Sequence, residues 1–365
     1  MNRSVAIIGS RGYPSFYGGF ETLVRELSPF LSDQGWDVTV YGRPQAVRVD
    51  FEGRDRRVES KLTVGVESKS LSTLSYGLTS TMSTAFRKPD VALVLNVANG
   101  YWLPLLASRG IPTLVNVDGM EWEREKWGPG AKRVFRGGAH MTAKFATEIV
   151  CDARAIAERW VSEFSRESTF IPYGGTPPSE SSPPEFLGLR PYILMVARFV
   201  PENTVGEFLE AASILSEMWD VVLVGSSGYG GELDRRAAEI DREHRAVHWL
   251  GHVNDDDLLF SLWSNASVYF HGHSVGGTNP ALVQAMACSA PTVARDTIYN
   301  REVLGDSALF CDPSVDSIVS NVGLLMDRED LRIKFAESVR VRSEAVYSWP
   351  LVCTAYEEAL RGLTA

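Results

Sequence analysis

Short runs of apolar residues recur along the chain, and stretches with apolar residues at helical spacing separate them. Such runs are typical of strands buried on both faces, and their alternation with helices predicts parallel sheets. The predicted strands are Ser4–Ile8, Asp37–Tyr41, Val91–Leu95, Thr113–Val117, Glu148–Cys151, Tyr192–Ala197, Val221–Val224, Val247–Leu250, Ser267–Phe270 and Thr292–Ala294, with Leu62–Val66 as an additional candidate. The pattern therefore predicts an α/β fold of the doubly wound kind.

A segment rich in proline, serine and glycine divides the chain. The sequence Gly-Gly-Thr-Pro-Pro-Ser-Glu-Ser-Ser-Pro-Pro lies between Tyr173 and Arg190, and this composition is typical of a linker. Each half begins with a strand, so we expect two Rossmann-like domains, at 1–175 and 176–346, that face each other across a cleft. Ligands of such sheets bind outside the carboxyl ends of the strands.

The composition excludes several classes of protein. Charged residues make up 22% of the 365 residues and hydrophobic ones 44%, which is usual for a soluble globular protein. The net charge of −10 argues against a nucleic-acid partner. The four cysteines lie far apart without metal-ligand spacing, so we expect buried free thiols. No apolar stretch is long enough to span a membrane, and we expect a cytoplasmic protein.

Two predicted strand–loop–helix units carry candidate binding chemistry. In the C-terminal half, Gly276 and Gly277 lie in a loop that leads to Asn279, a good N-cap, and Pro280, which suits the first helical position. Free N–H groups and the helix dipole make such a helix start an anion site, and an ordinary tight turn is the alternative. In the N-terminal half, a similar loop carries Arg11 at the second glycine position of the dinucleotide fingerprint, which argues against a nicotinamide oxidoreductase.

Polar side chains follow several other predicted strands. Asp118 and Glu121 come after Thr113–Val117, with Gly119 allowing a sharp turn, and a simple Asp-Gly turn is the alternative. Arg198 comes directly after Tyr192–Ala197, where it could bind phosphate bidentately or instead pair with Glu202 at the surface. His252 follows another predicted strand, and His271 and His273 flank Gly272 in the C-terminal glycine loop. No third ligand stands at a spacing suitable for a metal site.

Together these segments resemble retaining glycosyltransferases of the GT-B fold, family four, and within it the rhamnosyltransferase-like branch. The segments that carry the resemblance are 9–22, 116–122 with Lys126-Trp127, 171–174, 196–203 and 271–286. The resemblance implies a nucleoside diphosphate (NDP) sugar donor bound mostly by the C-terminal domain and an acceptor bound mostly by the N-terminal one. It also implies that a final helix, at about 347–365, crosses back to the N-terminal domain.

The resemblance implies roles for particular residues. Asp118, Glu121 and Arg198 form the expected catalytic set. The expected donor-binding set is Gly18, Gly19, Arg198, Asn203, His252, Val253, His273, Gly276, Gly277, Thr278, Asn279 and Gln284. The family has glutamates where this chain has Gly276 and Gln284, and a lysine where it has Asn203. Gln284 can still hydrogen-bond a ribose hydroxyl, and Asn203 can still donate to a phosphate.

The implied activity is transfer of a sugar, rhamnose favoured, from a dTDP-, UDP- or GDP-sugar to a saccharide or natural-product acceptor, with retention and without a metal or other cofactor. A role in polysaccharide biosynthesis, a lipid-linked acceptor and peripheral contact with the inner face of the cell membrane are further implications. Two alternatives stay open. One is a nucleotide-sugar epimerase on the same fold, and the other is a non-catalytic nucleotide-sugar binding protein, which the missing glutamates would suit.

Overall fold

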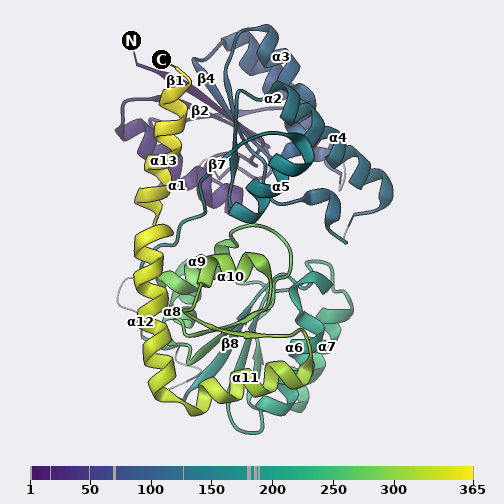
Figure 1. Cartoon of the computed structure of the whole chain (residues 1–365), viewed down its shortest axis with the longest axis vertical. Helices are drawn as coiled ribbons and strands as arrows, with labels where there is room; N and C mark the ends of the chain where they lie inside the picture. The colour runs from purple at the N-terminus through teal and green to yellow at the C-terminus, as the bar shows by residue number, and fades with distance from the viewer. Residues whose placement is uncertain are drawn as a thin grey trace. The chain divides into compact units, whose positions relative to one another are not determined.

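The computed structural model describes residues 2–16, 18–48, 50–68, 71–125, 127–178, 182–184, 187 and 190–364. The chain forms two compact units (Figure 1), which we call unit 1 and unit 2. Unit 1 contains Met1–Tyr173 together with Trp349–Ala365, and unit 2 contains Gly174–Ser348. The chain therefore passes from one unit to the other twice, at 173/174 and at 348/349. The expected division was at 175/176 and about 347.

Unit 1 is built on a seven-stranded parallel sheet with the order β3-β2-β1-β4-β5-β6-β7. Its strands are β1 (Ser4–Ile8), β2 (Asp37–Gly42), β3 (Glu59–Leu62), β4 (Val91–Leu95), β5 (Thr113–Asn116), β6 (Glu148–Cys151) and β7 (Thr169–Phe170). Its helices are α1 (Gly19–Asp33), α2 (Ser72–Arg87), α3 (Leu103–Ser108), α4 (Pro129–Phe145), α5 (Arg154–Phe164) and α13 (Trp349–Gly362), with short 3₁₀ turns η1 (Val97–Trp102) and η2 (Glu121–Glu123).

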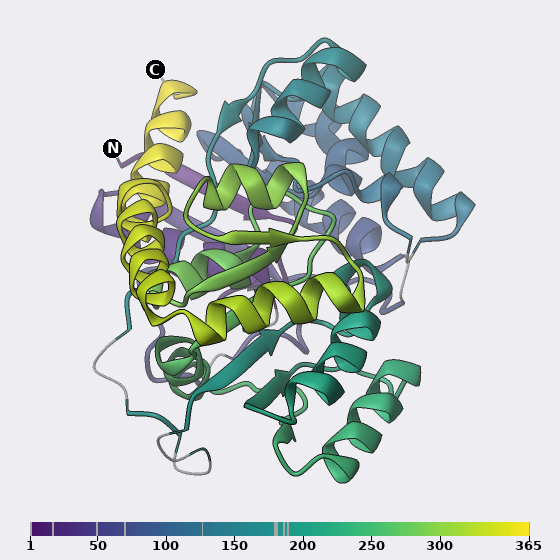
Figure 2. The same ribbon diagram turned by 60° about the horizontal axis from the view of Figure 1, so that its bottom comes forward.

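Unit 2 is built on a six-stranded parallel sheet with the order β10-β9-β8-β11-β12-β13. Its strands are β8 (Tyr192–Val196), β9 (Asp220–Val224), β10 (Val247–Trp249), β11 (Val268–His271), β12 (Thr292–Arg295) and β13 (Leu309–Cys311). Its helices are η4 (Pro201–Asn203), α6 (Val205–Leu215), α7 (Glu232–Glu243), α8 (Asp256–Asn265), α9 (Pro280–Ala287), α10 (Ile298–Leu304), α11 (Val315–Asp327) and α12 (Glu329–Val346). Figure 2 shows α11, in yellow-green, beside this sheet, where it contacts β11, β12 and β13.

Both sheets are of the predicted doubly wound type, and all five residues of β4 are buried. The strand order reverses between β1 and β4 in unit 1, and between β8 and β11 in unit 2. Such reversal points place loops side by side at the carboxyl edge of the sheet, where α/β folds bind ligands. The loops after β1, β8 and β11 are the segments that the sequence singled out as candidate sites.

Most predicted strands are confirmed to within one or two residues. The candidate at Leu62–Val66 is wrong, because β3 pairs with β2 over Glu59–Leu62 and ends where that candidate begins. The short strands β7 and β13 were not predicted, since two or three residues carry too little periodicity to be recognised. All four cysteines are free and buried, as expected.

The C-terminal helix α13 belongs to unit 1 and packs on α1 (Figure 1). Its inward face is apolar, with Val352, Cys353 and Leu360 buried. The Trp36 indole donates to Glu357 on α13 at 3.1 Å, which joins the two ends of the sequence within one unit. No helix in the described part of the chain is long and apolar enough to cross a bilayer.

Candidate functional site

Asp118 stands in a strained turn at the carboxyl end of β5. Its backbone is left-handed, with φ of 59°, which is uncommon for a residue other than glycine. The Asn116 side chain supports this turn, because its Oδ1 accepts the Asp118 N–H at 2.9 Å. The Asn116 amide donates in turn to the Tyr356 hydroxyl of α13 at 2.6 Å. We expected Gly119 to allow the sharp turn, and instead the left-handed residue is Asp118 itself.

Several carboxyl groups of unit 1 gather around the buried Tyr173 hydroxyl. Burial raises the pKa of this phenol well above its ordinary value, and the nearby Asp118, Asp152 and Glu21 charges act in the same direction. Glu21 comes from α1, Asp118 follows β5 and Asp152 follows β6, so the acids come from three parts of the fold. Tyr173 therefore remains a neutral hydroxyl in an acidic setting at the carboxyl edge of the sheet.

Glu121 has a structural role that the sequence did not reveal. Its carboxylate is buried at 4% exposure, forms an ion pair with Arg124 at 2.5 Å and accepts the Trp127 indole N–H at 2.9 Å. A carboxylate engaged on both sides in this way fixes the loop after β5. These contacts give Glu121 a role in the support of the loop that carries Asp118, and its direct part in chemistry stays a prediction. Lys126, which the resemblance also used, lies outside the described residues.

The glycine loop after β1 carries Gly18 and Gly19, where α1 begins. The buried Glu21 carboxylate closes this loop by accepting the Arg11 N–H at 2.9 Å. A Cβ atom at Gly18 would lie 3.2 Å from the same carboxylate, so the loop is closely packed there. The two glycines therefore lie on a braced loop at the carboxyl edge of the unit 1 sheet.

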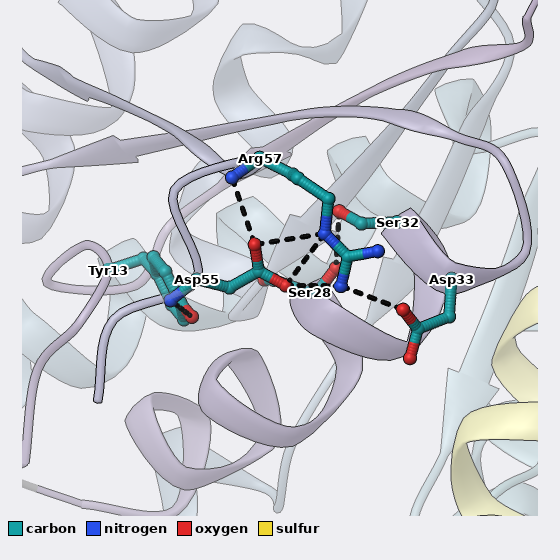
Figure 3. A network of polar contacts seen from close by, with 6 residues as sticks. All are labelled: Tyr13, Ser28, Ser32, Asp33, Asp55 and Arg57. Atoms are coloured by element: carbon teal, nitrogen blue, oxygen red, sulfur yellow. Dashed lines mark hydrogen bonds and ion pairs between the residues drawn. The ribbon is translucent and has the colours of Figure 1, made fainter.

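A network on the surface of unit 1 holds the segment after β2 against this loop (Figure 3). Arg57 lies between Asp55 and Asp33 and pairs with both, at 2.6 and 2.7 Å. The Asp55 N–H donates to the Tyr13 hydroxyl at 3.0 Å, and the Ser60 hydroxyl donates to the Tyr13 carbonyl at 2.6 Å. Tyr13, in the glycine loop, is thus tied to two neighbouring segments.

The same edge of unit 1 carries a group of arginines that the sequence analysis missed. Arg25 and Arg48 stack on Phe16, with guanidinium carbons 4.4 and 5.2 Å from the ring centre. The backbone N–H of Arg43 donates to the backbone carbonyl of Arg11 at 2.9 Å. Burial and the Arg11 charge both lower the pKa of Arg43. Arg25 lies on α1, whereas Arg43 and Arg48 follow β2, so no linear motif marks the group.

In unit 2, Arg198 is exposed just beyond β8. Within the described ranges it forms no ion pair, so the alternative pairing with Glu202 is not observed. The Asn203 amide donates to the Arg198 carbonyl at 2.9 Å and fixes the backbone at this point. Asn203 is buried, and the hydrogen bond that its amide donates is to the protein backbone.

The loop after β8 is locked to the glycine loop after β11. Thr204 has a left-handed backbone with φ of 57°, which is unusual for a β-branched residue, and its hydroxyl donates to the Gly272 carbonyl at 2.6 Å. Ser274 donates to the Glu202 carbonyl through both its N–H, at 3.0 Å, and its hydroxyl, at 2.8 Å. A Cβ atom at Gly272 would lie 2.4 Å from the Asn203 carbonyl oxygen, so only glycine allows this approach.

The start of α9 has the predicted form. Asn279 is the N-cap and accepts the Ala281 N–H at 3.0 Å, and Pro280 is the first helical residue. Gly276 has φ of 108°, a conformation that disfavours any side chain, so a glutamate is poorly accommodated at this point of the loop. Gly277 and the buried Thr278 complete the turn into the helix.

The histidines of this region differ in environment. His271 is completely buried in β11 and stacks on His273, with ring centres 4.4 Å apart. Burial and the neighbouring His273 hold the pKa of His271 well below its ordinary value, so it is neutral at pH 7. His273 is half-buried, and Asn300 donates to its carbonyl at 2.9 Å. His252 is exposed and Val253 half-buried, in the turn after β10.

Gln284 lies on α9, and its amide is engaged by the backbone of Thr176. The acidic run Asp255–Asp257 opens α8, with Asp255 as its N-cap, as the sequence indicated. Across the described residues, no group of three or more histidine, cysteine or acidic side chains is arranged to hold a metal ion.

The predicted residues thus form two groups, each at the carboxyl edge of one sheet. Unit 1 brings Asp118, Gly18 and Gly19 to the loops after β1 and β5. The candidates in unit 2 are Arg198, Asn203, His252, Val253, His273, Gly276, Gly277, Thr278, Asn279 and Gln284.

Known proteins resemble the chain in both sequence and fold. Residues 181–342 match the family described as "Glycosyl transferases group 1", and residues 76–176 match a "Domain of unknown function (DUF1972)". O-antigen chain mannosyltransferase B of Escherichia coli is 25% identical over 141 residues, 37% of each chain. A Campylobacter jejuni protein, N,N'-diacetylbacillosaminyl-diphospho-undecaprenol alpha-1,3-N-acetylgalactosaminyltransferase, is 26% identical over 153 residues, 41% of this chain and 39% of that one. The matches therefore span less than half the length of these relatives.

Two solved structures share the fold over nearly the whole chain. Sucrose-phosphate synthase from Thermosynechococcus elongatus has a TM-score of 0.81 at 16% identity and is covered over 99% of both chains. Anabaena Alr3699/HepE in complex with UDP-glucose has a TM-score of 0.76 at 13% identity, over 99% of this chain and 100% of that one. Residues 181–342, most of unit 2, therefore match the group 1 glycosyltransferase family, and the two doubly wound parallel sheets of the chain have the GT-B fold.

Proposed function

We propose that the protein transfers a hexose from an NDP-sugar to a saccharide acceptor. The observation that carries the proposal is Arg198, an exposed cation at the carboxyl end of β8, in the unit whose glycine loop leads to the start of α9. A guanidinium and the N–H groups of a helix start are the donors that a diphosphate needs. The family match and the UDP-glucose held by the Anabaena protein support the same class of donor.

The mechanism that we propose follows from the charges of the reaction. Breaking the bond between the sugar and the phosphate oxygen leaves negative charge on the diphosphate, which Arg198 and the start of α9 would stabilise without a metal. The acceptor oxygen forms the new bond from the face that the diphosphate leaves, which gives retention. The acceptor proton passes to the departing phosphate oxygen. Asp118 would orient the acceptor or stabilise positive charge on the sugar.

We also propose that the transferred sugar is rhamnose. The branch resemblance favours rhamnose on dTDP, whereas the two relatives are named as transferases of mannose and N-acetylgalactosamine. With Gly276 in a conformation that disfavours a side chain, the loop lacks the carboxylate that other family members would offer to the donor. We therefore expect fewer polar contacts to the donor sugar at this point, which suits a deoxy sugar such as rhamnose.

The acceptor that we propose is a saccharide on a lipid carrier, in polysaccharide biosynthesis. The arginines that line the carboxyl edge of unit 1 would suit an anionic linkage such as a diphosphate. The Campylobacter relative is named for a lipid-linked diphospho substrate. Such an acceptor would bring the protein to the inner face of the membrane as a peripheral partner.

A thermal-shift panel should identify the donor. Nucleoside diphosphates and NDP-sugars with dTDP, UDP and GDP are compared one at a time, and the matching donor at a hundred times its dissociation constant should add about 2.7 kcal/mol of stability. Such a gain is expected to raise the melting temperature by several degrees. If no member of the panel moves the melting temperature, the proposed donor class is wrong. Epimerised sugar in the absence of acceptor would favour the epimerase instead.

Transfer should not need a divalent metal. The charges proposed to stabilise the diphosphate are the Arg198 guanidinium and backbone N–H groups, so chelation should leave the rate unchanged. The assay measures transfer with excess EDTA, and then after magnesium or manganese is restored. Loss of transfer in EDTA that either metal reverses would contradict this prediction.

Tyr356→Phe should weaken unit 1 and slow transfer together. The change removes the hydroxyl that Asn116 contacts at 2.6 Å and leaves a buried amide donor unpaired, at a cost of about 1–3 kcal/mol. Because Asn116 also holds the Asp118 N–H, we expect a loss in turnover of several-fold beyond the loss of folded protein. Melting temperature and turnover of the folded fraction are measured beside Thr354→Ala, an exposed position on the same helix. Equal turnover in both variants would remove Tyr356 from the support of the site.

A further inference from the structure

Gln284 binds the backbone of a single residue far away in the sequence. Its Oε1 accepts the Thr176 N–H at 3.0 Å, and its Nε2 donates to the Thr176 carbonyl at 2.7 Å. The side chain therefore pairs with Thr176 on both sides, much as a neighbouring strand would. Only this orientation of the amide satisfies both contacts, so the positions of its nitrogen and oxygen follow from the geometry.

The residue before Thr176 connects this contact to another part of unit 2. The Gly175 N–H donates to the Tyr347 carbonyl at 2.7 Å, and Gly175 forms an isolated parallel bridge with Ser348. A Cβ atom at Gly175 would lie 2.5 Å from the Val283 carbonyl oxygen, so the segment is pressed directly against α9. Residues 174–176, residues 347–348 and α9 thus form one connected cluster.

This cluster contains both places where the chain leaves unit 2. The two links to unit 1 are the peptide bonds at 173/174 and 348/349. Gly174 is followed by Gly175, which Tyr347 holds, and by Thr176, which Gln284 of α9 holds. Ser348 forms a bridge with Gly175. The Gln284 amide therefore holds the start of the first link through Thr176, and the start of the second link is bridged to Gly175, the residue before Thr176.

We propose that Gln284 is a positioning residue, which fixes the beginning of both connections between the units, and is not a ribose ligand. This role goes beyond the proposed transfer reaction and holds whichever donor the protein binds. The positioning role also explains why residue 284 is a glutamine rather than a glutamate. An ionised glutamate would offer only acceptors, and one of its oxygens would lie against the Thr176 carbonyl without a proton between them. A glutamine supplies the one donor and one acceptor that the Thr176 backbone requires.

Gln284→Glu provides a test with an internal rescue. When ionised, the introduced carboxylate would oppose the Thr176 carbonyl and open the cluster, whereas the protonated carboxyl has one O–H donor and one acceptor, as the amide does. The contact to the carbonyl favours the protonated form and raises the pKa of this glutamate when the cluster is closed. The stabilising contribution is therefore complete at low pH and is lost as the pH rises through that value.

Hydrogen exchange of peptides that contain residues 174–176 measures the cluster directly. At about pH 8, we expect Gln284→Glu and Gln284→Leu to exchange this segment about tenfold faster than the unaltered protein at the same pH. At about pH 5, the ratio should fall towards one for Gln284→Glu and stay high for Gln284→Leu. The matched control is Gln34→Glu, an exposed position in unit 1, which should leave the exchange of 174–176 unchanged.

A ribose-binding role for Gln284 predicts a different result. A ribose ligand would leave the exchange of 174–176 unchanged in both variants at both pH values, and UDP affinity measured by calorimetry would change instead. That outcome would overturn the proposal. Circular dichroism of each variant at both pH values shows that it is folded, and Gln284→Leu keeps the test decisive if Gln284→Glu does not fold.

Discussion

Replacing Asp118 with asparagine is expected to lower the turnover of sugar transfer roughly 10²-fold or more, while donor affinity and melting temperature stay nearly unchanged. The carboxylate stands at the carboxyl end of β5, and its charge would act mainly on the transition state. Asparagine has the same shape and tolerates the left-handed backbone, which has φ of 59° at this position. The turn supported by Asn116 should therefore survive. Turnover, nucleotide affinity and melting temperature are measured on one preparation.

Glu121→Gln is the matched control for this experiment. It removes a charge of the same sign three residues away, but from a buried pair with Arg124. We expect this variant to lose stability while its folded fraction keeps most of its turnover, because breaking a buried ion pair is costly. If Asp118→Asn keeps near-wild-type turnover and Glu121→Gln does not, the catalytic assignment passes to Glu121.

Arg198→Ala should weaken donor binding by about 1.5–3 kcal/mol, which is roughly a 10- to 10²-fold rise in the dissociation constant. The side chain is exposed, so its removal breaks no ion pair seen in the described structure and should leave the melting temperature unchanged. The backbone at this point is fixed by Asn203 rather than by the guanidinium. Transfer at low donor concentration should fall by at least the same factor, since the leaving diphosphate loses its cation.

Two further variants separate charge from shape. Arg198→Lys keeps the charge but loses the planar fork, so we expect intermediate affinity. Arg328→Ala, a change at an exposed arginine before α12, should leave donor binding unaltered. Affinity is measured by calorimetry with the donor that the thermal-shift panel identifies. Unchanged donor affinity in Arg198→Ala would remove this residue from the site.

The sequence was sufficient for the framework because buried parallel strands have a simple pattern. Runs such as Val91–Leu95 are apolar at every position, and the structure buries every one of them. The start of α9 was also predictable, since Asn279 and Pro280 are the residue types that a helix start requires. These features depend on a few neighbouring residues, which a local pattern can describe.

The supports of the candidate site depend on contacts that no local pattern describes. Asn116 and Tyr356 are separated by 240 residues, and nothing near either one indicates the other. Thr204 adopts a left-handed backbone although it is β-branched, against its intrinsic preference. Gln284 seemed a weakened ligand when read against family glutamates, because its partner is the backbone of Thr176, whose position depends on the folded chain.

The place of α13 in unit 1 has a consequence for the order in which the protein is made. Unit 2 is a continuous stretch of chain, Gly174–Ser348, so the ribosome completes it before α13 emerges. Unit 1 is begun first, yet it cannot bury the face that receives Val352, Tyr356 and Leu360 until synthesis reaches those residues. N-terminal domains usually fold first, but here the final step of folding belongs to unit 1, after unit 2 is complete. Nascent chains that stop before α13 would expose an apolar surface on α1 and lack the Tyr356 support of the Asp118 turn.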